Sequence, residues 1–265
     1  MVRFIHITDT HVGPEAHFTL YGKQPLQYLQ RVINRINDLS FDVDFVLHTG
    51  DCVDDGRPES YQLFKQAMSK LRFPVKYVVG NHDDCEQLQT IVLGKPKPDR
   101  WLDYTFEAGG IKFVVLDTRG PVDPCGELQT EQLDWLRAHC APDGPPMVVA
   151  MHHVPIRLDT PWLDQIPAGW GERHMFITNG EDVLAAMRPA ANRIRGVFCG
   201  HVHGLFTSER DGVLFTAGQS TFAPIVTFPN SERVMNDEEQ TPMFNLVTVS
   251  ENQIIIRPRC FELAK

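Results

Sequence analysis

The sequence predicts one α/β domain in which two packed β-sheets are flanked by helices. Strand-like and helix-like segments alternate through the first half of the chain, and closely spaced strands dominate its end. No linker rich in Pro, Gly or Ser, no internal repeat and no low-complexity tract divides the 265 residues. A chain of this length can bury a substantial core, so residues 1–265 are assigned to a single domain.

The first half follows a β-α-β-α-β order. Short β-branched or apolar runs predict strands at 3–8, 43–49 and 75–79. Between them, apolar residues recur at helical spacing over 24–39 and 58–71. Strands and helices that alternate in this way form a parallel sheet with right-handed crossovers.

The second half begins with a hairpin, at 104–107 and 111–116, that turns at an Ala-Gly-Gly segment. A helix is predicted at 130–139. Further strands are predicted at 147–151, 194–198, 204–207, 213–216, 244–249 and 254–259. The spacing of the final strands indicates antiparallel pairing.

Composition narrows the classes of function. The net charge of −9, without any run of Lys or Arg, argues against a nucleic acid polymer as partner. The chain begins with a strand-like run rather than a signal peptide, and no apolar run approaches the ~20 residues needed to cross a membrane. The six scattered cysteines contain no CxxC pair, which is typical of reduced, mostly buried thiols. We therefore expect a cytoplasmic protein.

Five short polar blocks each follow a strand-like run. They are Asp9-Thr10-His11, Gly50-Asp51, Gly80-Asn81-His82-Asp83, His152-His153 and Gly200-His201-Val202-His203. The carboxyl ends of strands in α/β sheets are where loops converge on a ligand, so these blocks are expected to meet. Their oxygen and imidazole groups suit Zn, Mn, Fe or Co. The sequence thus predicts a metal centre.

The spacing within the blocks supports this interpretation. In the Asp-x-His and His-x-His pairs, a skip of one residue would place both side chains on one side of an extended segment. The preceding glycines allow sharp turns and close backbone approach. One Asp shared by two cations would hold them roughly 3.5–4 Å apart, as in two-metal hydrolysis.

Each block also has a structural interpretation when taken alone. Asp-x-His and Gly-Asp are common by chance, and Asn-His-Asp could cap a helix that begins near Asp83 or Asp84. The pair His152-His153 could be a core histidine beside a surface one. The joint occurrence of all five blocks, each after its own strand, favours the metal centre.

Taken together, the motifs DTH, GDCVDDGR, GNHDD, MHH and GHVH resemble those of the calcineurin-like metallophosphoesterase superfamily. The phrases LYG at Leu20, GRPESY at Gly56 and GNHDD at Gly80 resemble, more narrowly, bacterial class III cyclic-nucleotide phosphodiesterases and glycerophosphodiesterases. The resemblance implies a four-layer αββα sandwich of two mixed sheets flanked by helices.

The resemblance also implies two divalent or mixed-valence transition-metal ions, drawn from Fe, Mn, Zn and Co. The implied ligands are Asp9, His11 and His203 for the first ion, Asn81, His152 and His201 for the second, and Asp51 as the bridge. The family pattern favours the first histidine of the MHH block, which would leave His153 behind the ligands. In many relatives a proline follows this pair directly, whereas here Val154 intervenes.

These residues predict a metal-dependent phosphodiesterase for small diesters, either glycerophosphodiesters or 3′,5′-cyclic nucleotides. A hydroxide bound to the metals would attack phosphorus. His82 would bind no metal and would stabilise the phosphoryl charge or protonate the leaving alkoxide. The alternatives are a phosphomonoesterase or nuclease on the same centre, and a metal-free scaffold of the same fold.

Two long segments, 155–178 and 219–241, are predicted to be lids over the metal edge or parts of a homo-oligomer interface. The first carries Trp162 and Trp170, and the second Phe222 and Phe228.

Three acidic residues near the motifs have two interpretations. Asp54, Asp83 and Asp84 are either acceptors that orient the ligand histidines or solvated turn and cap residues.

Overall fold

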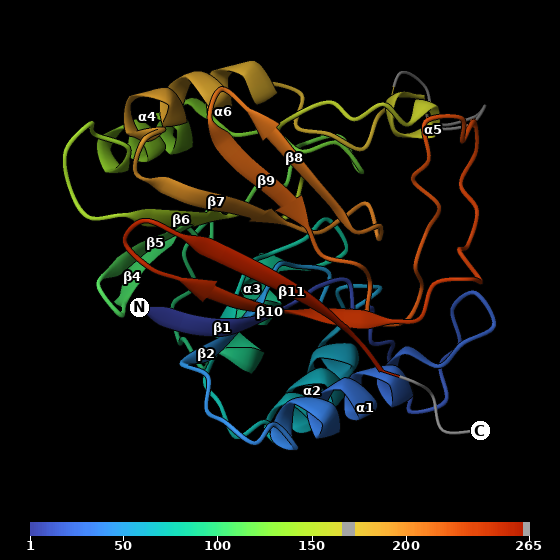
Figure 1. The fold of residues 1–265 in the computed structure, drawn as a ribbon. Coiled ribbons are helices and arrows are strands. Elements are labelled where there is room, and N and C mark those ends of the chain that lie inside the picture. The colour runs from blue at the N-terminus through green and yellow to red at the C-terminus, as the bar shows by residue number, and fades with distance from the viewer. Residues whose placement is uncertain (166–172, 262–265) are drawn as a thin grey trace.

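The computed structural model describes residues 1–165 and 173–261, which form two stacked sheets between two layers of helices (Figure 1). Helices α1 (Pro25–Asn37) and α2 (Pro58–Met68) cover one sheet, and α4 (Thr130–His139) and α6 (Gly180–Met187) cover the other. The predicted αββα sandwich is confirmed. Within the described ranges, no helix has the length and apolar character needed to span a membrane.

The first sheet has the strand order β11-β10-β1-β2-β3. Its strands are β1 (Val2–Ile7), β2 (Phe45–His48), β3 (Val75–Tyr77), β10 (Met243–Val249) and β11 (Ile254–Cys260). The three N-terminal strands are parallel, and β10 and β11 add antiparallel pairing. The predicted parallel unit and the predicted antiparallel end of the chain are both confirmed.

The second sheet has the order β4-β5-β6-β7-β9-β8. Its strands are β4 (Tyr104–Ala108), β5 (Ile111–Val115), β6 (Met147–Ala150), β7 (Ile194–Cys199), β8 (Phe206–Arg210) and β9 (Val213–Ala217). Strands β5, β6, β7 and β9 are parallel neighbours, and β4 and β8 close the two edges antiparallel.

Two sequence-based predictions need correction. The strand predicted at 204–207 lies at Phe206–Arg210, because the turn after the last metal motif extends to Leu205. Helix α6 was not predicted, since its eight residues are too few for a clear apolar period. The remaining short helical elements are α3 (Cys85–Gln87), η1 (Leu88–Val92), α5 (Pro161–Asp164) and η2 (Arg188–Ala190).

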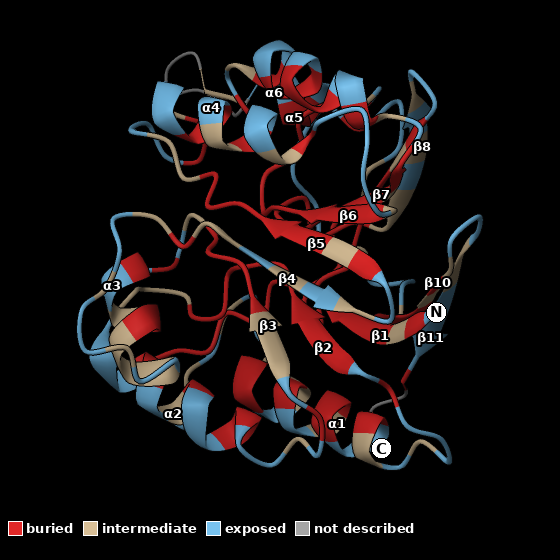
Figure 2. Cartoon of the chain, turned by 90° about the vertical axis from the view of Figure 1, so that its left-hand side faces the viewer, coloured by how far each residue is buried: buried red, intermediate tan, exposed pale blue. Residues whose placement is uncertain are grey.

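Three apolar layers hold the sandwich together, and the central strands of both sheets are buried while the edge strands and the outer faces of the helices are more exposed (Figure 2). The layer between the sheets is rich in phenylalanine. The ring of Phe4 lies 5.1 Å from that of Phe45, 5.7 Å from Phe113 and 5.3 Å from Phe198. Aromatic pairs at such distances stabilise beyond the area they bury, so the two sheets are fixed firmly against each other.

Candidate metal centre

The seven predicted ligands come together at the carboxyl edges of the two sheets. Their positions follow from the topology: blocks after β1, β2 and β3 meet blocks after β6 and β7, because the strands within each sheet run in parallel. All seven lie in one connected set of side-chain contacts. The convergence expected from the strand ends is therefore present.

One group consists of Asp9, His11 and His203. The Nε2 atoms of His11 and His203 lie 3.0 Å apart, and His203 Nε2 is 3.7 Å from Asp9 Oδ1. All three residues are buried. Asp9 and His11 follow a strand of the first sheet and His203 follows a strand of the second, so this group spans both sheets.

The other group consists of Asn81, His152 and His201. His152 Nε2 is 3.1 Å from Asn81 Oδ1 and 3.2 Å from His201 Nδ1. Asn81 follows β3 of the first sheet, and the two histidines follow strands of the second. This group too is shared between the sheets.

Asp51 lies between the two groups. Its Oδ2 atom is 3.5 Å from His11 Nε2 and 3.3 Å from His152 Nε2. Its Oδ1 atom accepts a hydrogen bond of 3.0 Å from the backbone N–H of His82. One carboxylate oxygen thus faces both groups, as a bridging ligand would.

The hydrogen bonds of the histidines show that the site fits cations. His11 Nδ1 lies 3.1 Å from Asp54 Oδ1, and His203 Nδ1 donates to the Ala223 carbonyl at 2.9 Å. A neutral imidazole carries one N–H, so both Nε2 atoms present lone pairs to each other at 3.0 Å. Such a pair is repulsive unless a cation contacts both nitrogens. Imidazole and carboxylate donors in this arrangement suit two transition-metal ions.

Backbone strain is concentrated at the same residues. Among the described residues, seven other than glycine have left-handed φ angles, and five of these are Asp9, His11, Asp51, His201 and His203. Each such conformation costs of the order of 1–3 kcal/mol and persists where the surroundings enforce it, which is common at functional sites. The expectation of extended Asp-x-His and His-x-His segments is therefore wrong, because φ is 52° at Asp9 and 43° at His11.

Glycine is required where the motif loops touch. A Cβ atom on Gly80 would lie 2.1 Å from Asp51 Oδ1, and one on Gly200 would lie 2.1 Å from Thr8 Oγ1. The close approach expected for these glycines is present, and it allows the loops after different strands to pack directly together.

His82 lies beside the ligand groups with its side chain 40% exposed. Its Nδ1 atom donates to the Asp54 carbonyl at 2.7 Å, which leaves Nε2 for a ligand in the pocket. Burial lowers the pKa of His82, but the charges of Asp51, Asp54 and Asp123 outweigh it and raise the pKa above its ordinary value. This side chain is suited to donate a proton or a hydrogen bond.

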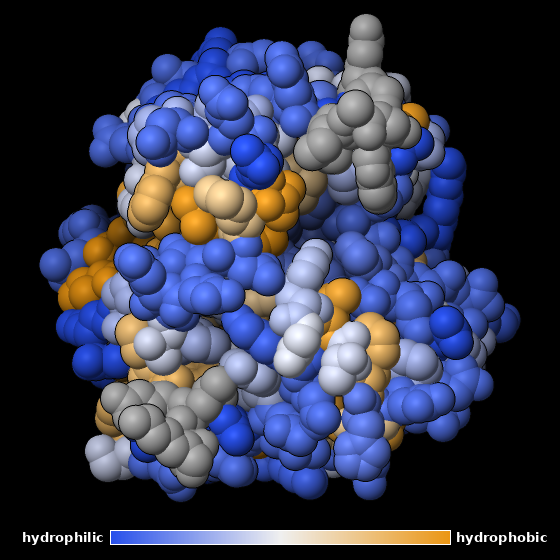
Figure 3. Space-filling model, turned by 90° about the vertical axis from the view of Figure 1, so that its right-hand side faces the viewer, coloured by the Kyte–Doolittle hydropathy of each residue, from blue (hydrophilic) through white to orange (hydrophobic). Residues whose placement is uncertain are grey.

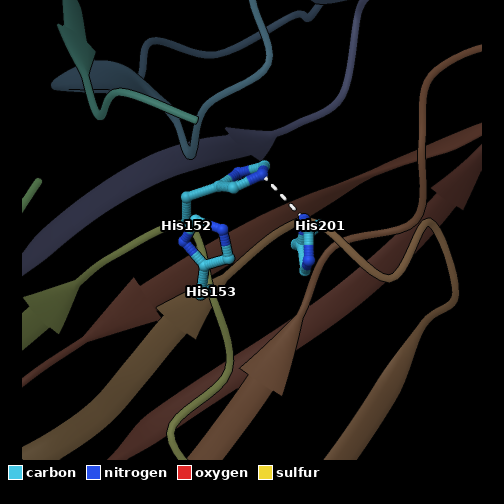
Figure 4. A group of neighbouring side chains, drawn as sticks. All are labelled: His152, His153 and His201. Atoms are coloured by element: carbon cyan, nitrogen blue, oxygen red, sulfur yellow. Dashed lines mark hydrogen bonds between the residues drawn. The ribbon is translucent and has the colours of Figure 1, made fainter. Parts of the chain in front are cut away.

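Figure 4 shows the two histidines of the MHH block beside His201. His152 points its Nε2 toward His201, while its Nδ1 donates to the Thr49 carbonyl at 2.8 Å. His153 instead contacts Thr118 Oγ1 at 2.8 Å through Nδ1. Both are fully buried, so the interpretation of one core and one surface histidine is wrong. The Nε2 atoms of His153 and His201 are buried without a hydrogen-bond partner in the described part of the chain.

The two histidines also differ in charge state. Burial lowers the pKa of His152, but Asp51 outweighs it and raises the pKa to about 9. Burial and the neighbouring His152 hold the pKa of His153 well below its ordinary value. The carboxylate that bridges the groups therefore acts on the first histidine of the pair more strongly than on the second.

The three acidic neighbours have three different roles. Asp54 contacts the ring of His11 and can orient it, as one of the two interpretations expected. Asp83 accepts backbone N–H groups from Cys52, Val53 and Gly80, and so ties two motif loops together. Asp84 accepts from the Gln87 N–H at 2.8 Å and caps α3, which is the structural interpretation.

A pocket of about 390 Å³ opens above these groups. We call the seven ligand-type residues its floor, of which His11, Asp51, Asn81, His201 and His203 line the pocket directly. The rim is formed by residues from the short helix α5 and from irregular segments: Leu20, Tyr21, Asp123, Pro124, Trp162, Met175, Ile225 and Val234. Asp123, which accepts a 2.9 Å hydrogen bond from Asn81 Nδ2, carried no sequence signal, because it lies 42 residues away in an irregular segment.

The two predicted lid segments contact each other at the rim. Trp162 donates from Nε1 to the Val226 carbonyl at 2.9 Å, and Thr160 Oγ1 donates to the Thr227 carbonyl at 2.9 Å. Trp162 lies in α5 and is buried, and Trp170 lies outside the described residues.

The two phenylalanines named in the second lid segment differ in their surroundings. Phe222 packs below the floor, with its ring 5.8 Å from that of His11, whereas Phe228 is 58% exposed. Figure 3 views the side where α5 and 219–241 lie, and its surface is largely hydrophilic with small apolar patches.

Comparisons with known proteins agree with this geometry. The family model described as calcineurin-like phosphoesterase matches residues 2–205. A 3′,5′-cyclic adenosine monophosphate phosphodiesterase CpdA from Pseudomonas aeruginosa is 28% identical, over 84% of this chain and 78% of the relative. A glycerophosphodiester phosphodiesterase GpdQ from Enterobacter lignolyticus is 30% identical, over 80% of this chain and 74% of the relative.

A solved dimetal phosphatase from Danio rerio has the same fold, with a TM-score of 0.69 at 15% identity over 98% of this chain and 96% of that one. The family match spans every floor residue, from Asp9 to His203.

Proposed function

Because this chain belongs to the calcineurin-like phosphoesterase family, we propose that it hydrolyses small phosphodiesters with two transition-metal ions held by the pocket floor. The observation that carries the proposal is the position of Asp51, whose Oδ2 atom faces His11 at 3.5 Å and His152 at 3.3 Å. Asp9, His11 and His203 would hold one ion, and Asn81, His152 and His201 the other, with Asp51 shared.

The ions, when bound, supply Lewis-acid activation of the phosphoryl oxygens and of a nucleophilic water. The chain itself supplies orientation. The Ala223 and Thr49 carbonyls hold the Nδ1–H groups of His203 and His152, so that Nε2 of each faces the centre. The buried floor also excludes bulk water from one side of the phosphate.

His82 is the proposed catalytic residue. Its ring is fixed by the Asp54 carbonyl, and the neighbouring carboxylates raise its pKa above the ordinary value, which favours the protonated form. From this position it donates to a phosphoryl oxygen or to the leaving alkoxide, a general-acid role.

The substrate we propose is a glycerophosphodiester or a 3′,5′-cyclic nucleotide. Relatives named for each activity match most of this chain. The pocket volume of about 390 Å³ accommodates a small diester, and the net charge of −9 disfavours polynucleotides. We place the enzyme in the cytoplasm, because all six cysteines are free thiols.

A hydrolysis panel tests the proposal. Enzyme reconstituted with Mn, Co, Fe or Zn is offered cyclic AMP, glycerophosphocholine, glycerophosphoethanolamine and a simple monoester. We expect one of the diesters to give the highest kcat/KM and chelation to abolish turnover. A strong preference for the monoester, or hydrolysis that persists after the metal is removed, would overturn it.

A further inference from the structure

The pocket carries two carboxylates in addition to the proposed metal ligands. Asp54 contacts His11 of the first group, and Asp123 contacts Asn81 of the second, so one carboxylate stands beside each group. Both line the pocket. No Lys or Arg lines it among the described residues. The walls therefore add negative charge around a centre that must attract an anion.

Asp123 is the more exposed of the two. It lies on the rim and is solvent-exposed, whereas the Asp54 side chain is 20% exposed and is held by His11. Within the described ranges, Asp123 accepts a hydrogen bond from a neutral amide, the Nδ2 group of Asn81 at 2.9 Å, and that bond does not cancel its charge. A substrate phosphate bound over the floor therefore experiences the field of Asp123.

We propose that Asp123 is a specificity-determining residue that makes the pocket select singly charged phosphodiesters over doubly charged phosphomonoesters. This inference rests on the proposed function and names the feature that restricts it to diesters. A diester carries one negative charge, and a monoester carries nearly two above its second pKa of about 6. The additional charge of the monoester is repelled by Asp123, so the shared metal chemistry is biased toward diesters.

The test compares matched chromogenic substrates on Mn-loaded enzyme at pH 8. The measured quantity is the ratio of kcat/KM for bis(p-nitrophenyl) phosphate to that for p-nitrophenyl phosphate. In Asp123→Asn we expect this ratio to fall about fivefold, the size of a partly solvated charge interaction of about 1 kcal/mol. Added salt should shrink the difference between wild type and variant, because it screens exposed charges.

Two matched variants separate charge from shape. Asp123→Glu keeps the charge and should stay within about twofold of the wild-type ratio. Asp134→Asn removes one exposed carboxylate from α4, where it pairs with Arg137, and should leave the ratio unchanged. Equal ratios in Asp123→Asn and wild type would overturn the proposal, as would an equal change in Asp123→Glu. Metal loss in Asp123→Asn alone would assign the residue to positioning Asn81 and would also overturn it.

A binding measurement decides the question independently of turnover. Titration calorimetry on Mn-loaded protein gives the Kd of inorganic phosphate, a dianion at pH 8, and of dimethyl phosphate, a monoanion. Asp123→Asn should bind phosphate about fivefold more tightly relative to dimethyl phosphate. If wild-type enzyme hydrolyses no diester, the proposed function fails, while this ratio of Kd values still supports or overturns the role of Asp123.

Discussion

The floor of the pocket follows on the ends of strands, whereas its rim comes from irregular segments and from the short helix α5. Six of the seven floor residues are buried and Asn81 is partly buried, and they are anchored by backbone carbonyls and by one another. Rim residues range from the buried Trp162 to Tyr21, which is 52% exposed. The same pocket therefore joins a rigid, polar base to a more exposed and more apolar wall.

The difference suggests that the floor carries the chemistry and that the rim determines which substrates bind. Groups that must hold metal ions within a few tenths of an ångström are placed on strand ends, where the sheet fixes them. Groups that choose among substrates stand on loops, which tolerate change. Mutations in the floor should therefore affect metal content and turnover, and mutations in the rim should affect KM and selectivity.

The strongest test of the floor is Asp51→Asn. It removes the charge that faces both ligand groups, so we expect turnover of any diester to fall by about 10⁴-fold or more. Elemental analysis should find fewer metal ions per chain than in wild type. Asp134→Asn serves as the control for loss of a surface carboxylate. Full turnover with two ions retained would show that Asp51 is not the bridge.

His82→Ala should separate catalysis from metal binding within the floor region. His82 is not one of the seven proposed ligands, although its ring lies 4.7 Å from that of His11. The variant should therefore keep its metal and lose about 10²–10³-fold in kcat. His174→Ala, in the rim segment, should change kcat little. A variant that purifies without metal would move His82 into the ligand set.

Asp54→Asn tests a pocket residue that is not a proposed ligand but contacts the floor residue His11. It weakens the anchor of His11 Nδ1 but leaves the Asp54 carbonyl that holds His82. Metal affinity is expected to fall about 10–100-fold, while excess metal restores most of kcat. The neighbouring Asp55→Asn, which disturbs only contacts to Arg57 and Ser60, is the control. A kcat that stays low at saturating metal would contradict this role.

Tyr21→Asn is expected to have the smallest effect and tests the rim. Tyr21 has a φ of 51°, which Asn adopts more readily, so the free energy of unfolding should rise by roughly 0.5–1 kcal/mol. Loss of the ring from the pocket wall should raise KM a few-fold at unchanged metal content. Asp211→Gly, at a strained turn outside the pocket, should leave KM unchanged. An unaltered KM in Tyr21→Asn would remove Tyr21 from the substrate wall.

The sequence allowed prediction of the elements whose pattern is local. The helix at 130–139 has the predicted bounds, and the hairpin at 104–116 turns where the glycines stand. Their periodicity, turn residues and caps lie within a few residues of one another. The eight-residue α6 was missed because it is too short to show a period.

For the metal centre, too, local sequence patterns were informative and tertiary contacts were not predictable. His152 and Asp51 are recognisable because each motif sits after its own strand, and the order of the strands brings the motifs together. The left-handed backbone of Asp9 and the contact between Asn81 and Asp123 are set by tertiary packing, which no local pattern records. Among the rim residues, Trp162 lies in a segment that was predicted as a lid, whereas the place of Asp123 in the pocket depends on tertiary packing and was not predicted.

On the proposed assignment, each ion takes ligands from both sheets: His11 and His203 for one, Asn81 and His152 for the other. A newly synthesised chain that has formed only one sheet would present only part of each ligand set and should bind metal weakly. Tight binding of the metal ions therefore requires that the two sheets have first packed together through the phenylalanine layer. Acquisition of the ions would then mark completed folding, and partly folded chains would leave the cellular metal pool untouched.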